Sequence, residues 1–214
     1  MKKAILFDLD GTLLDTTEGV LESAAHAARQ LGLPKLSHDT MLKFVGPPIQ
    51  DSFKIHYGLG EEPAQKAAEL FRSHYKEKAL LKAVPYPGLI EMLAQLRKMG
   101  CVLGVATYKR EDYALTILDH FGIAPFCRSM HGADNFNKLS KADIVSLCLN
   151  ELGAARKDSV LVGDTAHDAK GAALAGIDFI GVTFGFGFKT KEDVDAFANI
   201  GCAETIQQIV EYVK

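Results

Sequence analysis

The sequence predicts an α/β fold in which a parallel sheet carries helices on both faces and a long helical segment is inserted near the start of the chain. Three observations lead to this prediction. The apolar run Ala4–Asp8 leads into acids and Gly11, as a short buried strand does. From about residue 16 to residue 82, apolar residues recur only at helical spacing. From residue 85 onward, short apolar runs alternate with helical segments, which is typical of a parallel sheet.

The inserted segment is predicted to consist of helices separated by breaks. Its first helix is indicated by apolar residues at helical spacing that stop before Gly32 and Pro34, namely Val20, Leu21, Ala24, Ala28 and Leu31. Gly46-Pro47-Pro48 is a break, and Pro63 suits the first turn of a later helix. We find no strand pattern in this segment.

The remainder of the chain alternates regularly after the break Pro85-Tyr86-Pro87-Gly88. We expect strands over 101–106, 126–130, 160–163 and 179–183, and helices over 89–99, 112–121, 141–152, 167–175 and 203–213. These elements predict a Rossmann-like core of residues 1–15 and 85–214 and a helical cap domain of residues 16–84. Because parallel crossovers are right-handed, the carboxyl ends of the strands meet at one edge of the sheet.

Composition limits the classes of function. The chain has 214 residues, of which 48% are hydrophobic and 24% charged, with 24 Lys and Arg against 27 Asp and Glu. This slightly acidic balance argues against a nucleic-acid partner. No apolar run approaches the ~20 residues that span a bilayer, so we expect no membrane partner. The scattered thiols of Cys101, Cys127, Cys148 and Cys202 suggest reduced cysteines and a cytoplasmic location.

Acidic residues follow two of the predicted strands. Asp8 and Asp10 follow the first, and Asp164 and Asp168 follow the strand over 160–163. Ligands of open α/β sheets bind at this edge. Four carboxylates converging there repel one another unless a cation or protons intervene. An oxygen-only ligand set without paired His or Cys suits Mg²⁺, which often shares its shell with a phosphate group.

Four motifs then resemble those of the haloacid dehalogenase superfamily, in its phosphatase branch. Residues 7–15, Phe-Asp-Leu-Asp-Gly-Thr-Leu-Leu-Asp, resemble its first motif, and residues 163–168, Gly-Asp-Thr-Ala-His-Asp, resemble its fourth. Thr107 fits the second motif and Lys141 the third. The motifs occur in family order and extend over the whole core, and the inserted helices resemble the helical cap of that superfamily.

The resemblance assigns roles that general chemistry makes reasonable. Asp8 would be the nucleophile that forms an aspartyl-phosphate, and Asp10 the general acid and then base. Asp8, Asp164 and the backbone carbonyl of Asp10 would bind the metal. Asp168 would either hold a water of the metal shell or fix Lys141 in place.

The other motif residues would contact phosphate. Thr107 offers a hydroxyl and nearby N–H groups, and Gly11 and Thr12 shape the loop after the acids. Lys141 would neutralise the charge of the phosphate and of Asp8, although Lys138 is an alternative three residues away. The second motif often continues with Asn, whereas this chain has Tyr108 and Lys109. Any side-chain contact from position 108 is therefore open.

These observations leave several functions to compare. The first is a Mg²⁺-dependent phosphatase for a small phosphorylated metabolite such as phosphoglycolate, acting as a monomer or homodimer. A phosphomutase or nucleotidase on the same scaffold is a second. A phospho-accepting signalling module is a third, but Asp10 beside the acceptor and the enclosing cap favour turnover. In the cap, residues 44–53 resemble a segment of phosphoglycolate phosphatase-like and nucleotidase-like members. Lys43, Gln50 and Ser52 are the candidate substrate-selecting side chains of the cap.

Overall fold

The computed structural model describes residues 2–134 and 138–214. By its internal contacts the chain divides into two units. The core unit comprises Met1–Leu14 and Pro85–Lys214, and the helical unit comprises Asp15–Val84. In the described residues, no helix has the length and apolar character needed to cross a bilayer.

The helical unit contains four α-helices among the described residues. They are α1 (Thr17–Gln30), α2 (His38–Leu42), α3 (Ile49–Tyr57) and α4 (Glu61–His74), and a π-helical turn (Tyr75–Ala79) follows α4. Helix α4 packs against α1 and α3 through its buried alanines and Phe71. Two of the polar side chains singled out in the sequence bond within this unit. Ser52 is buried and donates to the carbonyl of Pro48, and Gln50 donates to Glu61.

The core unit is built on a parallel sheet, which confirms the predicted α/β class. In the described residues this sheet has six strands in the order β5-β4-β1-β6-β7-β8. The strands are β1 (Ala4–Phe7), β4 (Val102–Arg110), β5 (Cys127–Ala133), β6 (Ser159–Gly163), β7 (Asp178–Val182) and β8 (Gly201–Ala203). A separate two-stranded sheet pairs β2 (Leu14–Asp15) with β3 (Val84–Pro85).

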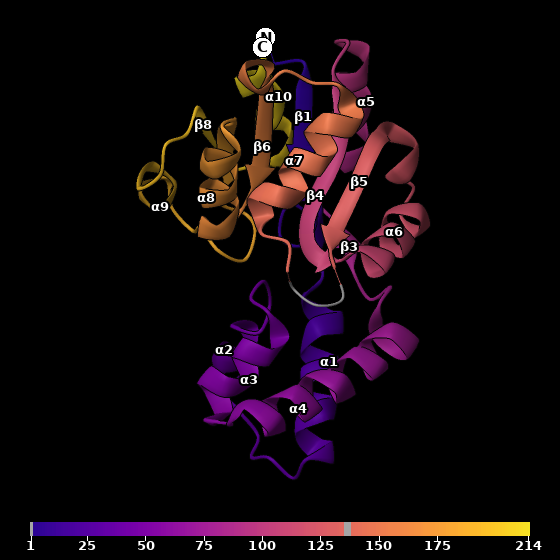
Figure 1. Cartoon of the computed structure of the whole chain (residues 1–214), viewed down its shortest axis with the longest axis vertical. Coiled ribbons are helices and arrows are strands. Elements are labelled where there is room, and N and C mark those ends of the chain that lie inside the picture. Colours follow the sequence, from indigo (N-terminus) through magenta and orange to yellow (C-terminus); the bar gives the residue numbers. More distant parts are fainter. Residues whose placement is uncertain (1, 135–137) are drawn as a thin grey trace. The chain divides into compact units, whose positions relative to one another are not determined.

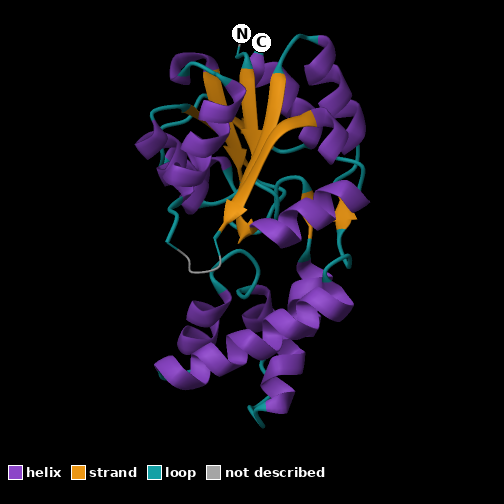
Figure 2. Cartoon of the chain, turned by 45° about the vertical axis from the view of Figure 1, so that its right-hand side comes forward, coloured by secondary structure: helices purple, strands orange, loops and turns teal. Residues whose placement is uncertain are grey.

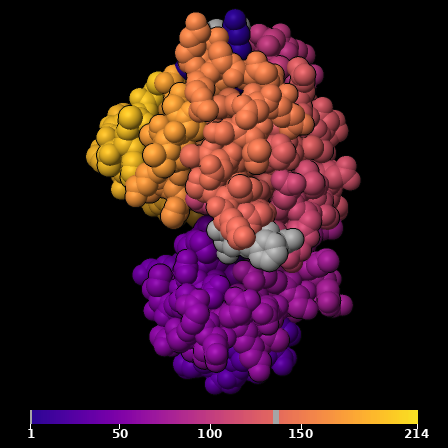
Figure 3. Space-filling model, in the orientation of Figure 1, coloured from indigo at the N-terminus to yellow at the C-terminus, as the bar shows by residue number. Residues whose placement is uncertain are grey.

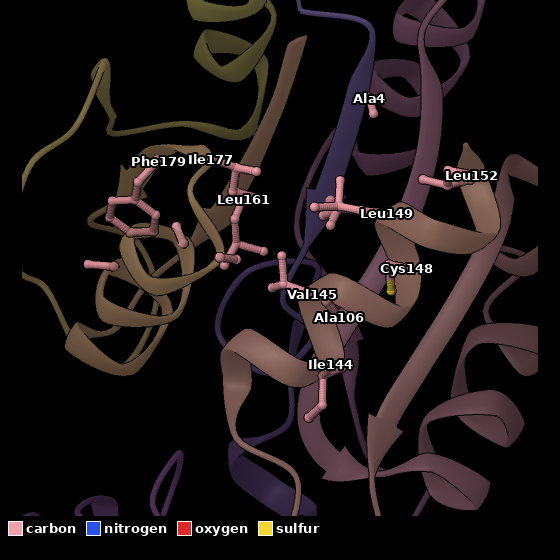
Figure 4. Packing of buried hydrophobic residues seen from close by; sticks show 14 of the residues in the cluster. Ala4, Ala106, Ile144, Val145, Cys148, Leu149, Leu152, Leu161, Ile177 and Phe179 are labelled. Atoms are coloured by element: carbon pink, nitrogen blue, oxygen red, sulfur yellow. The ribbon is translucent and has the colours of Figure 1, made fainter. Parts of the chain in front are cut away.

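The helices of the core unit are α5 (Leu89–Lys98), α6 (Glu111–His120), α7 (Lys141–Leu152), α8 (Ala166–Ala175), α9 (Lys191–Asp195) and α10 (Ile209–Val213). Helices α7 and α8 pack against each other on one face of the sheet (Figure 1). In the space-filling view, orange atoms of this part of the chain cover much of the visible surface of the core unit (Figure 3). Figure 4 shows Ile144, Val145 and Leu149 of α7 lying over this face, where the buried cluster also takes in Leu161 of β6.

The sequence prediction differs from the structure at the C-terminal end of the chain. The helix expected over 203–213 is wrong at its start, because Ala203 belongs to β8 and pairs with Val182. The helical part is a short 3-10 turn (Ile206–Gln208) followed by α10. Helix α9, strand β8 and the β2–β3 pair were not predicted, because two to five residues carry too little periodicity.

The direction of the strands shows at which edge of the sheet the candidate site residues lie. Both termini lie at one end of the core unit, where the N–H of Lys2 bonds to the carbonyl of Val213 (Figure 2). Strand β1 begins at that end, and its parallel neighbours run the same way. The carboxyl ends of the strands therefore meet at the opposite edge, and Asp8, Thr107 and Asp164 all lie there.

Candidate active site

Asp8 lies at the centre of the candidate site because it follows the buried strand β1. Its N–H bonds to the carbonyl of Val162 in β6, which continues the sheet pairing by one residue. The carboxylate is buried, and its Oδ1 accepts a hydrogen bond of 2.6 Å from the Nζ of Lys141. Burial raises the pKa of Asp8 to about 6, and the charge of Lys141 opposes that rise.

Lys141 reaches this site from the first position of α7. Ser140 caps the helix, and its hydroxyl accepts a bond from the N–H of Asp143. The Lys141 ammonium is buried between two carboxylates, with Asp8 and Asp168 each 2.6 Å away. Burial alone lowers the pKa of Lys141, but the charges of Asp168 and Asp8 outweigh it and raise that pKa above its ordinary value. The two carboxylates therefore favour the charged form of the Lys141 side chain.

Asp168 holds both Lys141 and the start of α8. Its Oδ1 pairs with the Lys141 ammonium. Its Oδ2 accepts bonds from the N–H and the hydroxyl of Thr165, at 3.1 and 2.6 Å, in a capping box. Both carboxylate oxygens of Asp168 thus have donors from this chain. Of the two roles considered for this residue, this arrangement favours fixing Lys141.

Asp164 follows β6 and is held by backbone N–H groups. Its Oδ2 accepts bonds from Phe186 and Gly187, at 2.7 and 3.1 Å, and its Oδ1 lies 3.4 Å from the Thr12 hydroxyl. Burial, followed by the charges of Asp168 and Asp8, raises the pKa of Asp164 to about 7. The three carboxylates Asp8, Asp164 and Asp168 offer oxygens that all lie within 4.8 Å of one another.

A loop that the sequence left without a role surrounds Asp164. Besides the two N–H groups above, the N–H of Phe188 bonds to the Asp164 carbonyl at 2.7 Å. A Cβ at Gly185 would overlap both the Gly11 carbonyl and the Asp164 side chain. Gly11 has φ +80° and its own added Cβ would also overlap Asp164, so both positions require glycine. The Gly-rich spacing of residues 185–187 was the signal that could have identified this cradle.

The end of β4 contributes three consecutive side chains. Thr107 is buried, and its Oγ1 accepts a bond of 3.1 Å from the N–H of Lys109. The Tyr108 hydroxyl accepts a bond of 2.9 Å from the N–H of Lys141. Position 108, left open by the sequence, therefore helps to place the start of α7.

The Asp10 carboxylate has a different hydrogen-bond partner from the carboxylates of the three-residue cluster. Its Oδ2 accepts a bond of 2.8 Å from the Nζ of Lys109, a residue to which the sequence analysis gave no role. Lys138, the alternative to Lys141, is exposed, and its N–H donates to the carboxylate of Asp134. The geometry therefore favours Lys141 as the lysine that faces Asp8.

Comparison with known proteins gives this arrangement a family. The model of a family described as "Haloacid dehalogenase-like hydrolase" matches residues 5–182. The tyrosine-protein kinase PtkA of Mycobacterium tuberculosis is 35% identical over 97% of this chain and 71% of its own length. A 5'-nucleotidase of Pseudomonas aeruginosa is 33% identical over 86% of this chain and 83% of its own.

Two further similarities extend the comparison. A phosphoglycolate phosphatase of Agrobacterium fabrum is 31% identical over 85% of this chain and 80% of its own. Among solved structures, a predicted phosphatase from Clostridium acetobutylicum has a TM-score of 0.88 and 32% identity, with 99% of each chain covered. The family named by the first and fourth motifs is thus found again by similarity over nearly the whole chain.

Proposed function

Because the chain belongs to the haloacid dehalogenase-like hydrolase family, we propose that it is a Mg²⁺-dependent phosphatase that hydrolyses a small phosphomonoester through an aspartyl-phosphate on Asp8. One observation carries the proposal. The Asp8 carboxylate is buried at the end of β1, paired to the Lys141 ammonium and within reach of two further carboxylates. A purely structural ion pair has no need of this excess of buried acid.

The charges of this cluster fit a divalent cation. When ionised, Asp8, Asp10, Asp164 and Asp168 together with Lys109 and Lys141 carry a net charge of −2. The donors are hard oxygens, which is the ligand type that Mg²⁺ prefers. We propose that Asp8, Asp164 and the backbone carbonyl of Asp10 hold the ion and that Asp168 supports the site through Lys141. When bound, the ion supplies positive charge that offsets the carboxylates and the phosphoryl oxygens of the substrate.

The residues of the chain divide the remaining work. An Asp8 oxygen attacks phosphorus, a bond to phosphorus forms, and the bond to the leaving oxygen breaks. Asp10 gives its proton to that leaving oxygen. Asp10 then takes a proton from a water molecule, which attacks the phosphorus of the aspartyl-phosphate and releases phosphate and free Asp8. Lys141 and the Thr107 hydroxyl stabilise the phosphoryl oxygens throughout.

The proposed substrate class rests on similarity to known proteins rather than on the site residues of the core unit. Similarity to a phosphoglycolate phosphatase and to a 5'-nucleotidase supports a small phosphorylated metabolite, with phosphoglycolate as the first compound to test. We propose no nucleic-acid or membrane partner, a cytoplasmic location and a monomer or homodimer. The cysteines support a reducing location, since Cys101, Cys127, Cys148 and Cys202 are all free thiols.

The proposal is tested by chelation and by one substitution. We expect EDTA to abolish release of phosphate from small phosphoesters, Mg²⁺ to restore it, and Ca²⁺ to restore little because its larger shell misplaces the nucleophile. Asp8→Asn removes the attacking group and should leave no turnover with any substrate. Asp119→Asn, which changes an exposed acid of α6, is the matched control and should keep full activity. Full turnover in EDTA, or an active Asp8→Asn variant, contradicts the proposal.

A second candidate is transfer of the phosphoryl group to an acceptor other than water. The 35% identity to a protein named as a tyrosine kinase favours including it, and a sugar phosphomutase is the same chemistry with another acceptor. In this chain, hydrolysis, transfer to tyrosine and transfer to a sugar phosphate would all proceed from the Asp8 phosphoenzyme. They differ in the group that attacks its phosphorus. Supplying the phosphoenzyme with a tyrosine peptide or a sugar phosphate and measuring the labelled product against free phosphate distinguishes them.

A further inference from the structure

Lys109 donates a hydrogen bond to the Asp10 carboxylate. Its Nζ lies 2.8 Å from Asp10 Oδ2, and the side chains are only 7% and 18% exposed. The other oxygen, Oδ1, is buried and has no hydrogen-bond partner among the described residues. A buried, unpaired carboxylate oxygen is costly, so a position that keeps one is expected to serve function.

The backbone of β4 is shaped to bring Lys109 to this place. Strand β4 keeps one register with β5 from Gly104 and Ser129 to Ala106 and His131, and then loses that register before Arg110 pairs with Ala133. The extra residues on β4 form a bulge, a feature that re-aims side chains beside active sites. Within it, the Lys109 N–H bonds back to the Thr107 hydroxyl at 3.1 Å.

Gly132 of β5 provides independent support for this bulge. A Cβ at Gly132 would lie 2.5 Å from the Lys109 carbonyl and 2.6 Å from the Cα of Glu111. The two strands therefore approach more closely at Lys109 than any other residue type at position 132 allows. The bulge and the glycine opposite it together fix where the Lys109 side chain begins.

We propose that Lys109 is a positioning residue for Asp10: it holds Oδ2 and so leaves Oδ1 as the oxygen that exchanges the proton with the leaving group and with water. This inference rests on the proposed phosphatase function. Lys141 is already shared between Asp8 and Asp168, so Lys109 provides a separate ammonium group for Asp10. Nucleophile and proton donor are thus each held by their own lysine.

The test compares two leaving groups. An alkyl phosphate needs a proton on its leaving oxygen, whereas nitrophenolate leaves without one. Lys109→Met keeps the length of the side chain and removes the charge. We expect kcat for the alkyl phosphate to fall ~10- to 100-fold, since a displaced catalytic group costs up to about 10²-fold. The rate of the nitrophenol burst should fall less than about 3-fold and should half-saturate at an unchanged substrate concentration. The steady-state rate after the burst should also fall, because hydrolysis of the phosphoenzyme still needs Asp10 as base.

Four further variants make the outcome decisive. Lys109→Arg keeps the charge and should recover most of the alkyl phosphate activity. In an Asp10→Ala background, Lys109→Met should cost nothing further, because the group that it positions is gone. Lys170→Met, at an exposed lysine of α8, is the control for loss of a lysine charge outside the site. Gly132→Ala should reproduce the leaving-group dependence of Lys109→Met by displacing the bulge.

The failure of this inference is distinguishable from failure of the proposed function. If the wild-type protein has no Mg²⁺-dependent phosphatase activity, both are overturned. If the wild type is active and Lys109→Met slows formation of the phosphoenzyme equally with both substrates, or raises the half-saturating concentration of that step for both, Lys109 binds phosphate instead and only the positioning role is lost. Additive losses in the double variant also overturn it. Matching far-UV circular dichroism and Tm values show that the variants remain folded.

Discussion

At the scale of single residues, Asp8 and Asp10 have the same side chain but different surroundings. Asp8 is held by Lys141 within a buried acidic cluster, whereas Asp10 is held by Lys109 and keeps one oxygen that has no donor in the described part of the chain. The Lys141 ammonium favours the ionised form of Asp8 against its burial, as a nucleophile requires, whereas the open oxygen of Asp10 suits a group that gives and takes a proton. These surroundings therefore support the proposed division of labour.

Asp10→Ala should separate the two half-reactions. Loss of general acid catalysis typically costs ~10²–10⁴-fold, so the alkyl phosphate should lose about that much. With nitrophenyl phosphate the first step should be largely spared, because the leaving group needs no proton. The second step still lacks its base, so the variant should release a burst of nitrophenol and stall as a hydroxylamine-labile phosphoenzyme. Rapid-quench kinetics measures the burst, and equal losses with no trapped phosphate would exclude this role for Asp10.

The site residues that directly follow regular strands could be predicted from the sequence. Asp8 and Asp164 follow neighbouring strands β1 and β6, so their proximity follows from the parallel order alone. Lys109 was missed, because its orientation depends on the bulge in β4, and no local pattern encodes a bulge formed with another strand. The catalytic and metal-binding roles themselves stay predictions.

At the scale of elements, the close packing of α7 and α8 sets the position of Lys141. Gly171 lies inside α8, and a Cβ there would lie 2.5 Å from the Lys141 Cγ and 2.8 Å from its Cβ. The first residue of α7 therefore contacts the backbone of α8 directly. Helix propensity alone disfavours a glycine at this position by about 1 kcal/mol relative to alanine, so the packing against Lys141 explains its presence.

Gly171→Ala should therefore lower activity although alanine is the better helix former. The added methyl group pushes the Lys141 stem away and lengthens its contacts with Asp8 and Asp168. We expect kcat to fall by about 10-fold or more, since catalysis depends on placement within an ångström. Ala173→Gly, at an exposed position of the same helix, is the control: it should cost stability of about 1 kcal/mol and leave kcat unchanged. A Gly171→Ala variant with higher Tm and full activity would contradict this account.

Long elements were predictable and short ones were not. The helix expected over 141–152 coincides with α7, whose periodicity extends over three turns and whose C-cap Gly153 has φ +61°. Strand β8 has three residues and, within residues 2–134 and 138–214, pairs with β7 alone. The formation of β8 thus depends on pairing with the edge of an existing sheet rather than on its own sequence. For this reason the helix predicted over 203–213 wrongly included Ala203.

At the scale of the whole molecule, the acidic cluster makes stability depend on pH. The pKa of Asp164 is about 7 in the folded protein against an ordinary value of 3.8, and that of Asp8 is about 6. The folded state therefore binds these protons more tightly than the unfolded state. Their stabilising contribution is complete below about pH 4 and is lost as the pH rises through 6 to 7. The metal-free protein should accordingly carry repulsion at neutral pH that a divalent cation relieves.

Asp164→Asn tests this dependence in the absence of metal. Asparagine keeps an oxygen for the N–H groups of Phe186 and Gly187 and places its amide near the Thr12 hydroxyl, so the bonding pattern survives. In EDTA at pH 8 the variant should be more stable than the wild type by up to a few kcal/mol, since one pKa unit corresponds to ~1.4 kcal/mol. At pH 4 to 5 the difference should nearly vanish. Adding Mg²⁺ at pH 8 should raise the Tm of the wild type and not that of the variant. Thermal unfolding at several pH values measures all three effects. A wild type that gains stability over Asp164→Asn as the pH rises without metal would show that the charge of Asp164 is already compensated within the chain.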